Sequence, residues 1–340
     1  AVDRRYPQRT RRRRPPEPES CAFIDYYSRD LNPMGEDNIT VGVISWYSAD
    51  QIKVLFESLI ANASQPEKIT FIICDNTGGK DIHLHNQFDN YCLILNYEPV
   101  IPLNWRPRRA KGSYAHGLGL NFLMSQIHTE YCLFSDPDCF VFAKSWDLKL
   151  KSLIDNKHIA VGAPYHSSKI VKYHNFPSPI FSFFKTAAFK EIKADWVPYR
   201  LPINTLITDQ LRRIPGIVGG YLGSKIWGRS FYLSKTAELL RILFGNSGKD
   251  TGWRISQAAR KKGYSARLLT SAITSQQLAY PFSEDNSVIA LVNEYELFLL
   301  DGMPFLTHLY SSKKRGKGGF RDEYERWRSL ACEVTKLQNS

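Results

Sequence analysis

The sequence predicts a mixed α/β fold in which a mostly parallel sheet is flanked by helices. The first observation is a strand–helix–strand pattern: two apolar runs, residues 39–46 (ITVGVISW) and 69–74 (ITFIIC), enclose a segment with apolar residues at helical spacing. The second is that another helical pattern, at residues 115–128, precedes the apolar run at 131–135 (YCLFS). Such crossovers place successive strands parallel in one sheet, with ligands expected where the carboxyl ends of the strands meet the loops.

The elements of the N-terminal part have local signatures. Ser48 and Gln51 have the spacing of a capping box ahead of the first helix. Residues 75–79 (DNTGG), directly after the second strand, are typical of a loop. Further along, the patterns predict a strand at 91–96, a loop rich in Pro and Arg at 99–112, the helix at 115–128, the strand at 131–135 and a hydrophobic run at 139–142.

Beyond about residue 155 the pattern is less regular. A helix at 250–262 is the clearest element, because Gly263 follows it in the position of a C-terminal cap. The other elements expected here are a strand at 159–163, helices at 205–213 and 234–244, a strand at 265–270 and an extended segment at 305–308. No repeat of about 20 to 50 residues is visible, which argues against a solenoid or propeller.

Charge divides the chain into a tail and a body. Residues 1–20 carry seven arginines and three acidic residues, so they supply +4 of the formal net charge of +12. This tail is rich in Arg and Pro and has no apolar periodicity, and we expect a disordered arm. The expected organisation is the arm followed by one catalytic domain with two halves, at 21–155 and 156–310, and a C-terminal extension at 311–340 that contains a basic flexible loop and a helix.

Asp136-Pro137-Asp138 follows the strand at 131–135 and is the sharpest chemical feature. Two carboxylates one residue apart offer hard oxygen ligands to Mg²⁺ or Mn²⁺, which in turn can hold a diphosphate. The tripeptide alone is also good turn chemistry. Its position at the end of a buried strand favours the metal site.

The order of these signals resembles the GT-A glycosyltransferases, particularly the inverting family 2 group: an apolar strand, a helix, a second strand that ends in Asp75-Asn76, the segment 112–121 (GSYAHGLGLN) and a DxD-type motif. The resemblance covers about residues 38–270. It implies a Rossmann-related domain that transfers a sugar from a nucleotide-sugar donor to a hydroxyl acceptor, with inversion. It also implies that residues 21–155 bind the donor and residues 156–310 bind the acceptor.

The resemblance implies roles for individual residues. Asp136 and Asp138 match the DxD motif, with Asp138 the more direct metal ligand, and Asp136 also serves the bound donor. The first loop, with Ser45 and Tyr47, and the end of the second strand, with Asp75 and Asn76, correspond to nucleoside contacts. The motif also departs from the family's pattern, because His116 stands in the glycine-containing segment and Trp46-Tyr47 replaces Tyr-Asn.

Asp250 is the candidate catalytic base. In the resembling family an acidic residue at a helix start takes the proton of the acceptor hydroxyl, and Asp250 opens the expected helix at 250–262. The alternative is that Asp250 is only an N-cap, which is a common role of Asp at helix starts. Asp209 is a second candidate base.

His308 is a candidate third metal ligand, because some GT-A enzymes use a histidine late in the chain, and imidazole can complete a site with carboxylates. Basic residues could neutralise the diphosphate: Lys111 lies in a basic loop, and a second basic cluster at 313–317 follows His308. The alternative for both clusters is a solvated loop. A flexible cover over the donor is the role we expect for the second.

Two other classes of function remain open on the sequence. The basic arm could bind nucleic acid or an anionic surface, although the body has no recognisable nucleic-acid module, so nucleic acid is disfavoured. A nucleotidyltransferase on the same fold is the other alternative. The six cysteines form no CxxC pair, and Cys74 and Cys132 lie in apolar runs expected to be buried, which favours a reducing compartment, so we expect a cytoplasmic protein. No apolar stretch reaches the ~18 residues of a membrane span, so we expect a soluble chain, with peripheral membrane association through the arm as an option. The expected partners are a nucleotide sugar and a glycan or lipid-linked acceptor.

Overall fold

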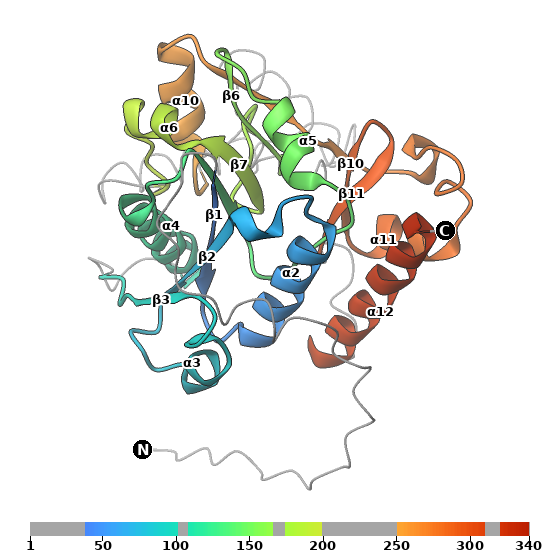
Figure 1. The fold of residues 1–340 in the computed structure, drawn as a ribbon, viewed down its shortest axis with the longest axis horizontal. Helices are drawn as coiled ribbons and strands as arrows, with labels where there is room; N and C mark the ends of the chain where they lie inside the picture. Colours follow the sequence, from blue (N-terminus) through green and yellow to red (C-terminus); the bar gives the residue numbers. More distant parts are fainter. Residues whose placement is uncertain (1–37, 101–107, 166–173, 199–249, 310–319, 340) are drawn as a thin grey trace, which may run out of the picture.

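The computed structural model describes residues 38–100, 108–165, 174–198, 250–309 and 320–339. Within these ranges the larger sheet has the strand order β3-β2-β1-β4-β7-β6-β8, and β7 is antiparallel to both of its neighbours whereas the other pairs are parallel (Figure 1). This confirms the predicted mixed, mostly parallel α/β fold. The strands are β1 (Ile39–Ser45), β2 (Ile69–Asp75), β3 (Leu93–Asn96), β4 (Tyr131–Ser135), β6 (His158–Gly162), β7 (Phe181–Lys185) and β8 (Ser265–Leu268).

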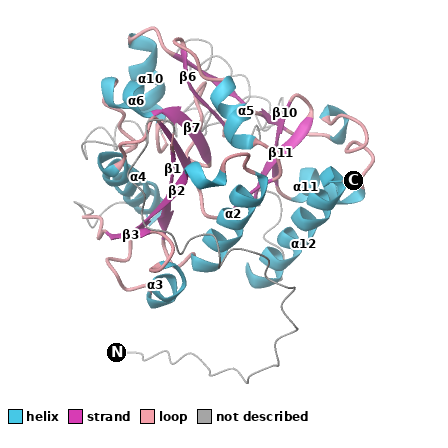
Figure 2. Ribbon diagram, viewed as in Figure 1, coloured by secondary structure: helices cyan, strands magenta, loops and turns pink. Residues whose placement is uncertain are grey.

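Helices cover both faces of this sheet (Figure 2). One face is packed by α2 (Ala49–Asn62), α3 (Ile82–Phe88) and α5 (Trp146–Ser152), and the other by α4 (Arg108–Gln126), α6 (Thr186–Glu191) and α10 (Trp253–Lys261). The alternation of a strand explains the two cores: Val41 and Val43 of β1 face the first layer of helices, while Ile44 faces the second. The result is a three-layer domain whose central strands are buried on both sides.

A second sheet stands beside the first. In the described part of the chain it has the order β5-β11-β10-β9, from β5 (Cys139–Val141), β9 (Thr270–Ser271), β10 (Glu296–Leu300) and β11 (Met303–His308). Helices α11 (Asn286–Glu294) and α12 (Phe320–Asn339) pack against it around the fully buried Trp327 (Figure 1). Both sheets contain strands from each of the two halves expected from the sequence.

Several predicted boundaries are wrong. Helix α4 begins at Arg108, inside the predicted loop, because residues 108–111 are good helix formers that follow Pro107. Helix α10 begins only at Trp253, since Gly252 has a φ of +81° and residues before it form a turn. The capping box at Ser48 is absent: its hydroxyl donates to the carbonyl oxygen of Trp46 at 3.2 Å.

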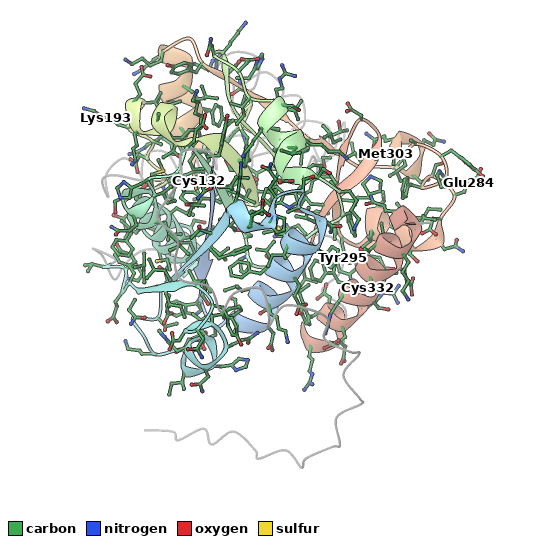
Figure 3. The ribbon with its side chains drawn as sticks, in the orientation of Figure 1. Cys132, Lys193, Glu284, Tyr295, Met303 and Cys332 are labelled. Carbon is green, nitrogen blue, oxygen red and sulfur yellow. The ribbon has the colours of Figure 1, made fainter. Side chains whose placement is uncertain are left out.

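The structure adds elements that the sequence did not predict, namely α3, α5, β7, α6, α11 and β10. The arm at 1–20, the helices at 205–213 and 234–244 and the basic cluster at 313–317 lie outside the described residues. Figure 3 shows the side chains that fill the layers, with Cys132 inside the molecule and Lys193 at its periphery. No helix within the described ranges is long and apolar enough to span a membrane.

Candidate metal and catalytic site

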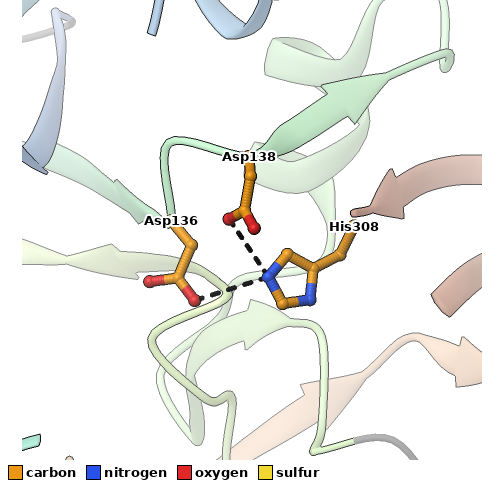
Figure 4. A group of neighbouring side chains, drawn as sticks. All are labelled: Asp136, Asp138 and His308. Carbon is orange, nitrogen blue, oxygen red and sulfur yellow. Dashed lines mark ion pairs between the residues drawn. The ribbon is translucent and has the colours of Figure 1, made fainter. Parts of the chain in front are cut away.

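Three potential metal ligands converge where β4 and β11 end. Asp138 Oδ1 lies 3.2 Å from Nε2 of His308, and Asp136 Oδ2 lies 3.7 Å from the same nitrogen. One ligand atom from each residue lies within 4.8 Å of the others. Figure 4 shows both carboxylates and the imidazole pointing toward one another from two distant segments of the chain. The structure therefore brings together the three residues that the sequence predicts as metal ligands.

Main-chain hydrogen bonds hold the two segments in place. The Asp136 amide donates to the carbonyl oxygen of Ile180 at 3.0 Å, and the Leu309 amide donates to the carbonyl oxygen of Asp138 at 2.9 Å. Strand β5 begins one residue after Asp138 and pairs with β11 so that Cys139 is opposite His308. The second sheet thus fixes the distance between the carboxylates and the imidazole.

His308 is held on its other side by Glu296. The Nδ1 atom of His308 lies 2.8 Å from Oε2 of Glu296, and both side chains are almost fully buried. Burial alone lowers the pKa of His308, but the charge and hydrogen bond of Asp138 and the hydrogen bond of Glu296 outweigh it and raise the pKa to about 10. The imidazole therefore sits in a strongly anionic environment that would equally favour a metal cation.

The donor set fits a divalent metal. Because Nδ1 faces Glu296, Nε2 is the imidazole nitrogen that faces both carboxylates. The side chains of Asp136 and Asp138 are 21% and 27% exposed, so their oxygens can be reached from solvent. Two carboxylates and one imidazole are ligands that Mn²⁺ accepts, and the carboxylates also suit Mg²⁺.

Two residues of this site were not assigned from the sequence. His116 on α4 has its Nε2 atom 3.6 Å from Asp136 Oδ1, so Asp136 lies between two imidazoles. Glu296 is the other. Asp301-Gly302 between two apolar runs is typical of a two-residue hairpin turn, but the turn alone would put Glu296 opposite Thr307. The irregularity between Phe298 and Leu299, which the sequence does not reveal, brings Glu296 opposite His308.

Asp250 lies in a tight turn ahead of α10. Its Oδ1 atom accepts a hydrogen bond from the Thr251 amide at 2.8 Å, and Asp250 as a whole is only 8% exposed. The Thr251 hydroxyl donates to the carbonyl oxygen of Ser113 at 3.2 Å, which ties the turn to α4. The N-cap position of α10 is occupied by Gly252, so the interpretation of Asp250 as an N-cap is wrong.

The turn is also clamped by residues 195–198. The Gly252 amide donates to the carbonyl oxygen of Trp196 at 3.0 Å, and Trp253 Nε1 donates to the carbonyl oxygen of Pro198 at 2.8 Å. The next residue, Arg254, pairs with Asp195 at 3.0 Å. The base candidate is therefore held by a rigid frame, which a catalytic group needs.

Tyr165 links Asp250 to the metal-ligand cluster. Burial, and then the charges of Asp250, Asp136 and Glu296, raise the pKa of Tyr165 well above its usual value, and its phenol also hydrogen-bonds Asp250. The phenol lies 3.4 Å from the carbonyl oxygen of Thr251. Tyr165 thus lies within electrostatic reach of both Asp250 and Asp136.

Asp75 and Asn76, predicted as nucleoside contacts, are both buried. The Asp75 carboxylate accepts hydrogen bonds from the amides of Thr77 at 2.8 Å and Gly79 at 3.0 Å. The Asn76 amide nitrogen donates to the carbonyl oxygen of Ala115 on α4 at 3.2 Å. In this conformation the two side chains shape the loop after β2, and their contact with a nucleoside stays a prediction.

The other predicted donor contacts are dispersed. Ser45 is fully buried at the end of β1, and its hydroxyl has no hydrogen-bond partner among the described residues. Tyr47, by contrast, is 59% exposed, has a φ of +55° and packs edge-on against Trp46. Lys111 lies in the first turns of α4. The second candidate base, Asp209, lies outside the described residues.

Comparisons with known proteins give similarity at the level of solved structures. No protein-family model and no curated protein matches the sequence. A mannosyltransferase, PcManGT from Pyrobaculum calidifontis in complex with GDP-Man and Mn²⁺, matches 46% of this chain and 46% of its own, with 14% identity and a TM-score of 0.33. The chain thus spans about half the length of this protein.

Two further structures are similar to this chain. TarS 1-349 of S. aureus in complex with UDP-GlcNAc matches 47% of this chain and 48% of its own, with 16% identity and a TM-score of 0.31. The apo-form glycosyltransferase GlyE of Streptococcus pneumoniae matches 88% of this chain and 64% of its own, with 12% identity and a TM-score of 0.34. Likenesses at this level assign neither an activity nor a donor to this chain.

Proposed function

We propose that this protein is a metal-dependent glycosyltransferase of the GT-A type that moves a sugar from a nucleotide-sugar donor to a hydroxyl acceptor. The observation that carries the proposal is the convergence of Asp136, Asp138 and His308 at the carboxyl end of β4. This is the edge of a mostly parallel sheet at which such folds bind ligands. The acceptor would be a hydroxyl of a glycan or of a lipid-linked molecule. The transferred sugar would be a hexose.

The three residues would hold Mn²⁺ or Mg²⁺. A bound divalent cation supplies a counter-charge for the departing diphosphate. The imidazole of His308 favours Mn²⁺ over Mg²⁺ relative to a site made of oxygen ligands alone. His116 lies beside Asp136 and could donate a hydrogen bond to a phosphate oxygen, and Lys111 would add positive charge from α4.

Asp250 would act as the general base. A carboxylate that removes the proton of the acceptor hydroxyl makes the oxygen a better nucleophile toward the anomeric carbon, and direct attack opposite the leaving group inverts that carbon. The Thr251 amide and the Tyr165 phenol donate to this carboxylate and orient it. Ser45, Tyr47, Asp75 and Asn76 line the ends of β1 and β2, where the resemblance puts the nucleoside.

Thermal unfolding of the full chain with a panel of donors tests this function. UDP-, GDP-, dTDP- and CMP-sugars are added with Mn²⁺, with Mg²⁺ or with EDTA, and GDP-mannose and UDP-GlcNAc head the panel. A ligand that binds only the folded chain stabilises it by about 2.7 kcal/mol at a concentration of 100 times its Kd. We expect one donor class to raise the unfolding midpoint with metal and not with EDTA.

Asp138→Ala, which removes one of the proposed metal ligands, tests whether this shift depends on the metal site. It should abolish the metal-dependent shift, whereas Glu284→Ala, which removes an exposed carboxylate at the edge of the molecule, should not (Figure 3). Products distinguish the alternatives, because sugar transfer releases a nucleoside diphosphate and nucleotidyl transfer releases pyrophosphate. Equal shifts with EDTA and in Asp138→Ala would contradict the metal role.

A further inference from the structure

The carboxylate of Glu296 is unusual for its surroundings. Glu296 begins β10, and the residues that follow it, Leu297, Phe298 and Leu299, are all buried in apolar clusters. Glu296 itself is only 1% exposed. Burying an ionised carboxylate costs desolvation free energy that its ion pair often does not recover. An apolar residue of similar size would often stabilise the fold as well or better. Stability alone therefore does not account for a glutamate at this position.

The hairpin of β10 and β11 places this carboxylate next to the Nδ1 atom of His308. Asp301 and Gly302 form the two-residue turn between β10 and β11, and both have positive φ, as the tight hairpin turn requires. The register that follows from the turn, with one irregularity between Phe298 and Leu299, places Glu296 directly opposite His308. Side chains opposite one another on one face of an antiparallel pair are close enough to bond. The resulting contact is the 2.8 Å approach of Oε2 to Nδ1.

We propose that Glu296 is a positioning residue for the metal site: it accepts the Nδ1–H bond of His308 and thereby holds Nε2 toward Asp136 and Asp138. The inference rests on the proposed function, because it assumes that these three residues bind a metal. A histidine that ligates through Nε2 needs its proton on Nδ1, and an acceptor at Nδ1 fixes both the tautomer and the plane of the ring. Loss of such an acceptor typically lowers metal affinity about 10- to 100-fold.

Three variants of the full chain test the role. Glu296→Leu removes the acceptor, and Glu296→Gln keeps an amide oxygen that can accept the same bond. Thr307→Val is the matched control, since the Thr307 hydroxyl donates to the main-chain oxygen of Glu296 at 3.0 Å and accepts from Trp327 Nε1 at 3.3 Å, so the variant removes buried hydrogen bonds in the same strand pair but keeps the carboxylate and the imidazole. The measurements are the Mn²⁺ affinity, from the paramagnetic resonance signal of free Mn²⁺, and the Nδ1 proton of His308 in ¹⁵N-histidine spectra. Circular dichroism checks that each variant is folded.

We expect Glu296→Leu to bind Mn²⁺ about 10- to 100-fold more weakly than the native chain, with Glu296→Gln and Thr307→Val close to native. The exchange-protected Nδ1 proton should disappear only in Glu296→Leu. Native Mn²⁺ affinity in folded Glu296→Leu would overturn the inference and leave the proposed function standing, and so would an equal loss in Glu296→Leu and Thr307→Val. A native chain that binds neither Mn²⁺ nor Mg²⁺ would overturn the proposed function and the inference together.

Discussion

The side-chain amide of Asn121 on α4 forms hydrogen bonds through both of its polar atoms, one with the carboxylate of Asp195 and one with the main chain of Trp196. Its Nδ2 atom donates to Asp195 Oδ1 at 3.0 Å, and its Oδ1 atom accepts from the Trp196 amide at 2.9 Å. Asp195 in turn pairs through Oδ2 with Arg254 in the first turn of α10. One carboxylate therefore joins α4, residues 195–197 and α10, and these are the segments that hold Asp250. The position of the candidate base depends on this link.

Replacing Asp195 should weaken both the fold and the site. Asp195→Ala leaves the Asn121 amide and the Arg254 guanidinium without this acceptor, and each largely buried group that loses its partner costs about 1–3 kcal/mol. We expect a clearly lower unfolding midpoint and a lower kcat. Glu191→Ala, which removes an exposed acid that pairs with Lys262, is the control and should change both little. Equal midpoints in the two variants would show that the Asp195 link is dispensable.

Two glycines on α4 make a matched pair for testing how tightly that helix packs. A Cβ atom on Gly117 would lie 2.7 Å from the carbonyl oxygen of Trp196, whereas a Cβ atom on Gly112 would meet nothing within 4 Å. Gly117→Ala should therefore destabilise the fold by about 1–3 kcal/mol through overpacking. Gly112→Ala should be neutral or stabilise it by up to about 1 kcal/mol, because Ala is the better helix former.

Urea unfolding of both variants measures the difference. The carbonyl oxygen of Trp196 also accepts the hydrogen bond of the Gly252 amide. Displacement of α4 in Gly117→Ala should therefore lower turnover as well, which Gly112→Ala should not do. If Gly117→Ala is as stable as the native chain, the close approach of α4 to Trp196 is not as the structure has it.

The sequence was most informative where function depends on residues that follow one strand. The apolar runs of β1, β2 and β4 are short, strongly apolar and bounded by loop residues, and the pair Asp136 and Asp138 follows directly on β4. A strand buried on both faces of a parallel sheet is a continuous apolar run, so it can be recognised from the local sequence without knowledge of its tertiary contacts. His308 could be proposed only through the resemblance, because its approach to Asp138 depends on the pairing of β5 with β11.

Residues that depend on non-local packing were not predictable in this way. Glu296 reads as the polar start of an apolar run, and only the register of the hairpin reveals that it faces His308. The sequence of β7, FSFFK, shows no alternation of apolar and polar residues, because both faces of that strand are buried. The sequence predicts the start of α10 too early, because nothing local to it reveals that Gly252 has a positive φ and that its amide donates to the carbonyl oxygen of Trp196. Tertiary contacts decided each of these cases.

Tyr165→Phe should lower turnover with little effect on the fold. The ring packs edge-on against His174 with centroids 5.1 Å apart, and Phe preserves that contact. The variant loses the phenol that donates to Asp250. A hydrogen bond to a charged group is worth about 1.5–3 kcal/mol, and we expect kcat to fall about tenfold with an unchanged KM for the donor.

Steady-state kinetics check this, with Tyr264→Phe as the control. Tyr264 donates to the exposed Glu191 at 2.7 Å, so that variant removes the same kind of bond away from the site and should keep its native kcat. Native turnover in Tyr165→Phe would mean that the phenol does not orient the base.

Asp250→Asn tests the base itself. The amide keeps the size of the side chain and an oxygen that can accept the Thr251 amide, so the turn ahead of α10 should persist. The amide cannot take a proton from an acceptor hydroxyl, and loss of a general base typically costs about 10²- to 10⁴-fold in rate. We expect metal-dependent donor binding to stay native while transfer falls by that factor. Asp285→Asn is the control, because Asp285 is an N-cap that accepts the Ser287 and Val288 amides, and Asn caps a helix equally well. Donor binding and transfer that decline together in Asp250→Asn would assign Asp250 a structural role, and Asp209 would become the residue to test.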